Sequence, residues 1–145
     1  VNKLLENIDF PDLLDQLDLS PAPGGDDIRV HFGGPVESGR GFVLHTSDYV
    51  QDATMVIDDQ IAMTATTDIL RDIAEGDGPR NSLLALGYAG WGPGQLDTEI
   101  QANGWLSVAA DDTLVFGTDP DTIWKDALAK MGIDVSMLSG DAGHA

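Results

Sequence analysis

The chain has 145 residues, 42% of them hydrophobic, and contains no cysteine. This length and composition suit one soluble domain with its own core, and the lack of cysteine excludes disulfides, thiolate metal sites and cysteine nucleophiles. The 25 acidic and seven basic residues give a formal net charge of −18, and because the basic residues are scattered, direct binding to nucleic acid is not expected. No apolar run approaches the ~18 residues of a membrane span, so we expect a cytoplasmic protein without membrane contact.

The first part of the chain predicts one helix followed by four short strands. Asp9-Phe10-Pro11 has the pattern of a helix start, and leucines at positions 13, 14 and 17 form an apolar stripe that carries the helix to about residue 18. Segments with the composition of strands follow at 28–32, 41–45, 54–57 and 61–64. Asp58-Asp59-Gln60 lies between the last two and predicts a hairpin turn.

The second part mixes helices and strands. Thr66 or Thr67 can cap a helix that ends at Gly76-Asp77-Gly78-Pro79, and the apolar run 82–88 is typical of a central strand covered on both faces. We expect a helix at 93–103, strands at 105–108 and 113–116, and a last helix that opens at Asp119-Pro120 and ends near Gly132. The elements do not follow a strict βαβ rhythm, which favours a single domain of the α+β class over residues 1–145.

A glycine-rich turn at 87–95 joins the expected central strand to the next helix. It matches neither the dinucleotide-binding G-x-G-x-x-G pattern nor a phosphate-binding Walker A loop. We interpret its glycines as a tight turn beside Tyr88 and Trp91; the alternative is an anion site made by free backbone N–H groups at the helix start. We expect the rings of Trp91, Trp105 and Trp124 to pack mainly in the core or within a subdomain.

The helix after this turn has polar residues on its apolar stripe. Glu99 and Asn103 share that stripe with two apolar residues, and Gln95 lies one turn before Glu99. A buried Glu99 needs hydrogen-bond donors, or its pKa rises. We favour a structural carboxylate, more buried than Asp97 or Asp111; the alternative is a general acid in a cleft.

The loop and strand from Gly33 to His45 supply the remaining candidates. Arg40 could bind a carboxylate or phosphate, and His45 could act as a base or ligand. The alternative, which we favour, is an arginine paired with one of the many acids and a histidine hydrogen-bonded at a strand end. The three histidines lack metal-ligand spacing and no serine sits in a nucleophile elbow, so we assign no catalytic residue, metal or cofactor.

Several of these motifs, taken together and in order, resemble the YqgE/AlgH family. The matching segments are Val1-Asn2-Lys3, Gly33-Gly34-Pro35-Val36, Arg40 to His45, Gly87 to Trp91, Gly94-Gln95-Leu96, Glu99-Ile100, Asn103 with Trp105, and Ala142 to Ala145. The resemblance implies a bacterial, cytoplasmic protein with a bent mixed sheet that forms a partial barrel with flanking helices, and a role as a transcriptional regulator. It brings no catalytic residues. It also implies a further strand-rich segment ahead of Val1, where the structure would then expose a strand edge or a gap.

Two hypotheses follow for function. The first is a non-enzymatic regulatory or interaction domain that acts on an unidentified protein or small-molecule partner and not by direct DNA binding. The second is a small-molecule binder or enzyme that uses a glycine-lined cleft. Candidate ligand-binding residues are Gly33, Gly34, Arg40, His45, Gln95, Glu99 and Asn103. Convergence of the last five on one pocket would favour the second hypothesis, and the oligomeric state is left open.

Overall fold

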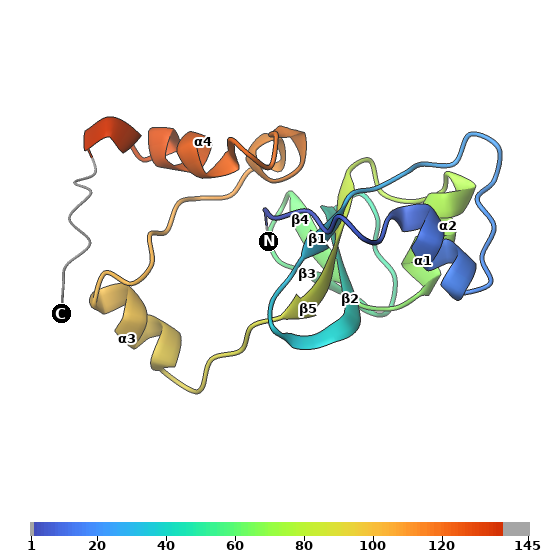
Figure 1. Ribbon diagram of the computed structural model, residues 1–145, viewed down its shortest axis with the longest axis horizontal. Helices are drawn as coiled ribbons and strands as arrows, with labels where there is room; N and C mark the ends of the chain where they lie inside the picture. The colour runs from blue at the N-terminus through green and yellow to red at the C-terminus, as the bar shows by residue number, and fades with distance from the viewer. Residues whose placement is uncertain (1, 138–145) are drawn as a thin grey trace.

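A five-stranded mixed sheet is the centre of the computed structural model, which describes residues 2–137 (Figure 1). The strands are Val30–Phe32 (β1), Val36–Thr46 (β2), Thr54–Val56 (β3), Ile61–Thr64 (β4) and Ser82–Tyr88 (β5), in the spatial order β1-β5-β2-β4-β3. β1 and β5 are parallel, and the other neighbours are antiparallel. The α+β class is therefore confirmed, and so is the hairpin formed by β3 and β4.

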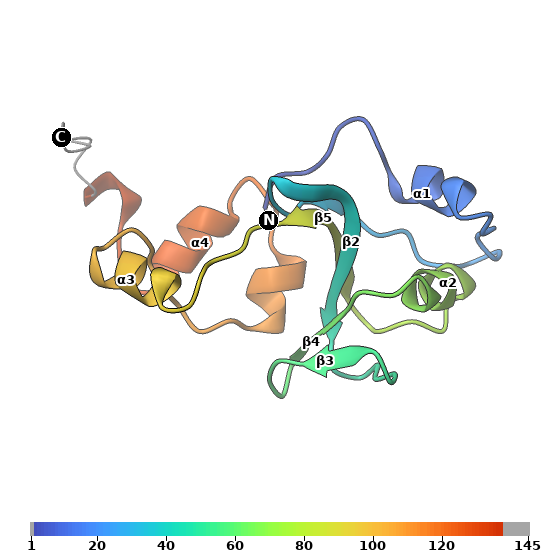
Figure 2. The same ribbon diagram turned by 90° about the horizontal axis from the view of Figure 1, so that it is seen from below.

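The sheet is open, so the partial barrel that the resemblance implied is not present among the described residues. Closure requires the two edge strands to pair with each other, but β1 and β3 have three residues each and lie at opposite ends of the strand order. Bending is confined mainly to β2, which curves where its register with β5 shifts between Val36 and Gly41 (Figure 2). The outer edge of β1 carries one antiparallel bridge, between His31 and Leu4.

Glycines permit the close approach of backbones at the end of β5. Gly87 has a φ of 79°, and a Cβ placed on it would lie 2.4 Å from the carbonyl oxygen of Gly34. A Cβ on Gly33 would in turn lie 2.1 Å from the carbonyl oxygen of Gly87. Any side chain at these positions would push the two segments apart, so Gly33 and Gly87 serve the architecture.

Two helices cover one face of the sheet and form the hydrophobic core with it. They are Phe10–Gln16 (α1) and Asp68–Glu75 (α2); α1 begins with a capping box in which Asp9 and Asp12 each accept from the other's backbone N–H, and Gly76 ends α2 in the left-handed conformation. The buried cluster consists of Phe10, Leu14, Val30, Val43, Tyr49, Ile69, Leu70, Ile73, Ala74 and Leu84.

The C-terminal part lies on the other side of the sheet from α1 and α2 (Figures 1 and 2). It contains Gln95–Gln101 (α3), a π-helical turn at Thr113–Gly117 (η1), Ile123–Lys130 (α4) and a 3-10 turn at Val135–Met137 (η2). The helices expected at 93–103 and after Asp119 are confirmed. Within residues 2–137, no helix has the length and apolar character that crossing a membrane requires.

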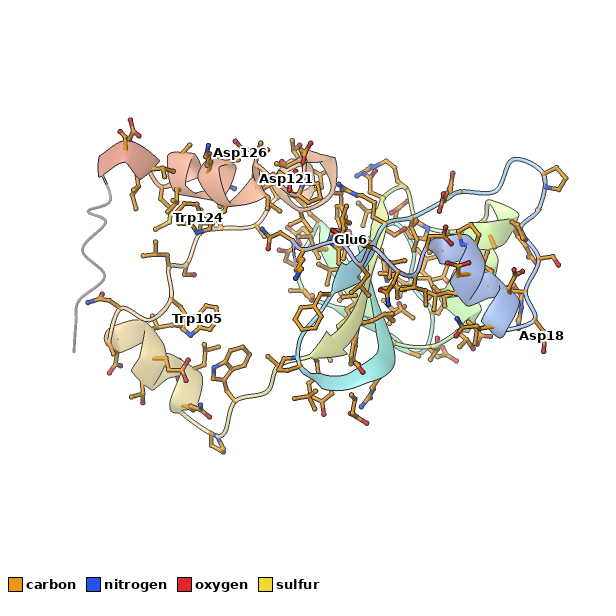
Figure 3. The ribbon with its side chains drawn as sticks, in the orientation of Figure 1. Glu6, Asp18, Trp105, Asp121, Trp124 and Asp126 are labelled. Carbon is orange, nitrogen blue, oxygen red and sulfur yellow. The ribbon has the colours of Figure 1, made fainter. Side chains whose placement is uncertain are left out.

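Two of our predictions for this part are wrong. Residues 105–108 and 113–116 do not form strands, because no described strand lies beside them to complete a ladder, and Asp111 instead accepts from the backbone N–H of Leu114 at 2.7 Å, which starts the η1 turn. Trp91 and Trp105 pack edge to face within the C-terminal part, as the subdomain alternative expected, but none of the three rings lies in the core: the exposed fractions of Trp91, Trp105 and Trp124 are 39%, 50% and 54%. Figure 3 shows the last two apart from the sheet.

Candidate functional site

The face of the sheet opposite α1 and α2 forms one wall of a pocket of about 670 Å³. Strand register builds this wall from two rows of side chains. In the first row, Ala85 of β5 lies between His31 of β1 and Phe42 of β2. In the second, Leu44 of β2 lies between Leu83 of β5 and Met63 of β4. All six side chains line the pocket, so its floor is almost entirely apolar.

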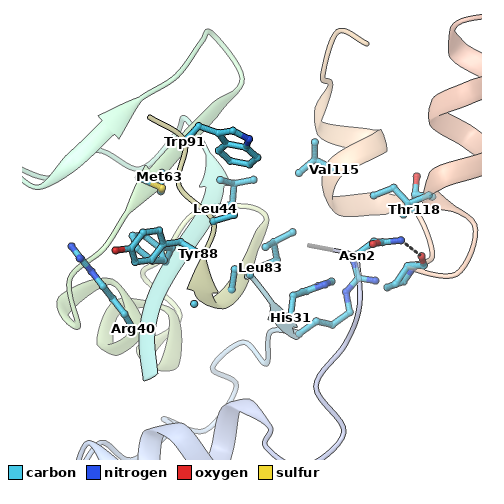
Figure 4. Close-up of a pocket in the computed structure, with 18 residues that line it drawn as sticks. Asn2, His31, Arg40, Leu44, Met63, Leu83, Tyr88, Trp91, Val115 and Thr118 are labelled. Carbon is cyan, nitrogen blue, oxygen red and sulfur yellow. Dashed lines mark hydrogen bonds between the residues drawn. The ribbon is translucent and has the colours of Figure 1, made fainter. Parts of the chain in front are cut away.

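The opposite wall comes from the segment around η1 and the start of α4. Val115, Thr118, Pro120 and Ile123 line it, and Trp91 and Tyr88 stand at the side of the sheet wall (Figure 4). Two long-range hydrogen bonds hold this segment to the N-terminal half. The Asn2 side chain donates to the carbonyl oxygen of Pro120 at 3.4 Å, and the Arg29 guanidinium donates to that of Phe116 at 3.0 Å.

Two of the seven basic residues line this pocket, Arg29 and Arg40. Arg40 pairs with Glu37 at 3.4 Å, and both side chains are more than half exposed, so water screens the pair strongly. Its guanidinium also lies 5.3 Å from the ring centre of Phe42 and 6.0 Å from that of Tyr88, within the range of cation–π contact. Arg29 is half-buried and pairs with no carboxylate among the described residues.

His45 lies at a strand end and is fully buried. Its Nδ1 lies 2.8 Å from the carbonyl oxygen of Thr46, which can only accept, so Nδ1 carries the proton. Nε2 then accepts from the Thr64 hydroxyl at 2.8 Å, and Thr64 accepts from Thr54. This chain ties β2 to β4 and β3. Burial lowers the pKa of His45, and the favoured interpretation of a hydrogen-bonded strand-end histidine matches this geometry.

Glu99 of α3 is held by three donors. The indole N–H groups of Trp105 and Trp91 donate to its Oε2 at 2.7 and 3.1 Å, and the Gln95 amide donates to its Oε1 at 3.0 Å. These hydrogen bonds, that of Trp105 above all, lower the pKa of Glu99. Glu99 is partly covered and Asp97 is exposed, which confirms the prediction that Glu99 is more buried than Asp97. Asp111 is partly covered like Glu99, so the prediction is not confirmed for Asp111.

The other polar candidates of α3 have local roles. Gln95 also accepts from the backbone N–H of Gly92 at 3.0 Å, so its amide fastens the turn to the helix. Asn103 follows the helix with a φ of 59°, a left-handed conformation that asparagine tolerates better than most residues. The two rings of Trp91 and Trp105 meet edge to face at 5.8 Å between centres.

The seven candidate residues therefore fall into separate places. Gly33 and Arg40 line the pocket, Gln95 and Glu99 belong to α3, Asn103 follows that helix, and His45 belongs to the network between β2 and β4. Gly34 packs against the backbone at Tyr88. No group of three or more histidine, aspartate or glutamate side chains that could hold a metal occurs within residues 2–137.

The sequence analysis missed most of the pocket wall. The signal was present in the strand alternation, because residues two apart point to the same face: Arg29 with His31, and Phe42 with Leu44. What could not be predicted was which strands are neighbours, and hence which pairs form a continuous surface. The motif residues Val1 and 142–145 lie outside the described part of the chain.

Comparison with known proteins found a family, relatives and solved structures to which this chain is similar. A family model described as AlgH-like matches residues 1–136. A UPF0301 protein of Rhodospirillum rubrum is 56% identical over 145 residues, which are 100% of this chain and 76% of that protein. The solution structure of AlgH from Pseudomonas aeruginosa superimposes with a TM-score of 0.75 at 38% identity, covering 100% of this chain and 77% of that one. A crystal structure of the protein DIP2367 from Corynebacterium diphtheriae, at 17% identity and a TM-score of 0.61, shares the fold.

Proposed function

The chain belongs to the AlgH-like family, and we propose that it is a non-enzymatic interaction domain whose partner is a polypeptide with an apolar and a basic character. Any regulatory role in transcription then passes through that partner and not through direct contact with DNA. The observation that carries the proposal is an exposed apolar surface around α3.

This α3 surface consists of Trp91, Leu96, Ile100, Trp105 and Leu106. Each of these side chains is between 38% and 58% exposed, although the cost of leaving apolar area in water favours their burial. Continuous apolar patches on soluble proteins usually mark interaction sites, and tryptophan is enriched among the residues that dominate binding energy. The hydrogen bonds of Glu99 hold both indoles in place before a partner arrives, which lowers the entropic cost of binding.

Charge indicates the kind of partner. No lysine or arginine occurs between Arg80 and Lys125, and the acids of this stretch are Asp97, Glu99, Asp111, Asp112, Asp119 and Asp121. The whole chain has a formal charge of −18. A basic segment is therefore attracted over a distance and a polyanion such as DNA is repelled.

Two observations support a non-enzymatic role. His45 is fully buried and has both ring nitrogens in hydrogen bonds, so it has no free nitrogen to present to a substrate. Glu99 has its pKa lowered by its donors and stays ionised near neutral pH, whereas a general acid must hold a proton there.

The proposal can be tested with a helical peptide of leucine and lysine that has one apolar and one basic face. A scrambled peptide of the same composition, which forms no apolar face, is the control. At physiological salt we expect calorimetry to show binding of the amphipathic peptide at least about tenfold tighter than the scrambled one. Equal affinities would mean that charge alone attracts the peptides, which would contradict the proposal.

Matched variants locate the peptide. Trp105→Ser should weaken binding about tenfold or more, because it removes one of the two indole rings of the α3 surface. Met55→Ser is the control, since Met55 is 60% exposed on the edge strand β3, away from that surface. An equal loss in both variants would contradict docking on the α3 surface.

The pocket favours a second candidate function, the binding of a small molecule. Its volume of about 670 Å³ is within the usual range of ligand sites, roughly 300–1,000 Å³. Its apolar floor with few polar groups at the side is also typical of such sites. Gly33, Gly87 and Arg40, which belong to motifs of the sequence analysis, are part of the lining.

A further inference from the structure

We propose that the pocket between the sheet and the η1 segment binds an amphipathic anion, a molecule with an apolar chain that ends in a carboxylate, and that Arg29 binds the carboxylate. This inference rests on the second candidate function and can be tested apart from peptide docking on the α3 surface, with which the pocket shares Trp91. It is carried by the shape and lining of the pocket and by the pairing of the arginines.

The floor of the pocket is apolar, so the main part of the ligand is apolar as well. Ala85 and Phe42 in one row, and Leu83, Leu44 and Met63 in the other, present a strip of apolar side chains across three strands. Val115 faces this strip from the opposite wall (Figure 4), and Ile123 also lines the pocket. A chain laid along the strip would remove apolar area from water on both sides, the main source of affinity for such a ligand.

Arg29 indicates that the end group of the ligand is an anion. Of the four arginines, Arg40, Arg71 and Arg80 each pair with an acidic side chain at 3.3–3.4 Å. Arg29 has no such carboxylate within residues 2–137, in a chain with 25 acids. A half-buried cation beside an apolar surface is costly without a counter-charge, and a ligand carboxylate would supply one.

Arg29 has the donors for this task. One N–H of its guanidinium donates to the Phe116 carbonyl oxygen at 3.0 Å, and this bond fixes the direction of the group. A guanidinium has five N–H donors, so others remain for the ligand, and its planar fork suits the two oxygens of a carboxylate. Arg40 at the same pocket adds positive charge but already has Glu37.

Three ligands with the same apolar chain separate this proposal from its alternatives: decanoate, decanol and decyltrimethylammonium. Calorimetric titration of the intact chain below the micelle concentration should show decanoate binding at least about tenfold tighter than decanol. The ammonium compound should bind weakest, although the net charge of the chain favours it. Equal affinities for decanoate and decanol would show that binding is purely apolar. Tightest binding of the ammonium compound would show that the negative charge of the protein surface attracts the ligand. Either result would overturn the proposal.

Variants test the role of Arg29. Arg29→Gln should reduce the preference for decanoate over decanol about tenfold, and Arg29→Lys should keep part of it. Arg71→Gln is the matched control, because Arg71 is an exposed arginine on α2, on the covered side of the sheet. The ratio of the two affinities is read in each variant, so a general loss of stability does not imitate the effect. An unchanged ratio in Arg29→Gln, or an equal change in Arg71→Gln, would refute the assignment.

The two proposals fail separately. Leu106→Ser should lower the affinity for the amphipathic peptide and leave that for decanoate within about twofold, because Leu106, unlike Trp91 of the same surface, does not line the pocket. Arg29→Gln should lower the affinity for decanoate and leave that for the amphipathic peptide within about twofold. If decanoate does not bind while the peptide does, the ligand proposal falls and the interaction domain stands.

Discussion

At the scale of single residues, the hydrogen bonds around His45 show how a side chain that is often catalytic can be structural. Each donor in the network from Thr54 through Thr64 to His45 has one acceptor, and the carbonyl oxygen of Thr46 fixes the tautomer. Protonation of Nε2 would turn an acceptor into a second donor and leave the Thr64 hydroxyl badly oriented. The sequence analysis could favour this role but not identify the partners, because the threonines come from other strands.

This network predicts how stability depends on pH. The folded state lowers the pKa of His45 below its ordinary value of 6.5, so the unfolded chain binds the proton more readily. The stability that neutral His45 contributes to the folded state is fully present above pH 6.5. It is lost as the pH falls toward the lower pKa that His45 has in the folded state. Urea unfolding at about pH 7.5 and about pH 5.5 should therefore show a drop in unfolding free energy that is smaller in His45→Gln. The same drop in both proteins would contradict the buried, neutral histidine.

Gly87 offers a test of the architectural role of the glycines. Gly87→Ala strains the backbone and places a Cβ 2.4 Å from the Gly34 carbonyl oxygen. Gly24→Ala is the control, since Gly24 also has a positive φ, 85°, but a Cβ added there would meet no heavy atom within 4 Å. Denaturant unfolding should show a cost of about 1–2 kcal/mol for Gly24→Ala and about 1–3 kcal/mol more for Gly87→Ala. Equal costs would mean that the close approach is unimportant.

At the scale of elements, the sequence predicted those helices and strands that are determined by interactions between residues close together in the chain. The capping pattern before α1, the apolar stripe of α2 and the apolar run of β5 lead to the elements that the structure has. Residues 105–108 and 113–116 have strand composition but no strand. A strand depends on a neighbour that sequence pattern alone does not supply, and the carboxylate of Asp111 favours a helical turn instead.

The capping box of α1 gives a prediction at this scale. Asp9→Ala removes the acceptor for the backbone N–H of Asp12, which lies 2.9 Å from Asp9 Oδ1, and should cost about 1 kcal/mol of unfolding free energy. Asp15→Ala changes the charge equally on the same helix, at an exposed position, and should stay within about 0.5 kcal/mol. Thermal or urea unfolding measures both. A loss as large in Asp15→Ala would show that charge, not capping, is responsible.

At the scale of the whole molecule, the sequence predicted the α+β class but neither surface that we propose to be functional. Strand order decides that Leu44 lies between Leu83 and Met63, and this order comes from long-range packing. The tryptophans lie outside the main core for a related reason. Hydrophobic composition does not reveal which apolar faces remain uncovered once α1 and α2 have packed on the sheet.

The exposed tryptophans instead lead to the central claim, that the α3 surface is where a partner binds. Hydrogen exchange of the intact chain, with and without the amphipathic leucine–lysine peptide, tests this most directly because it reports on each segment separately. We predict slower exchange confined to residues 91–106 and no change in α1 or α2. Slower exchange elsewhere with 91–106 unaffected, or no change anywhere at saturating peptide, would contradict the account.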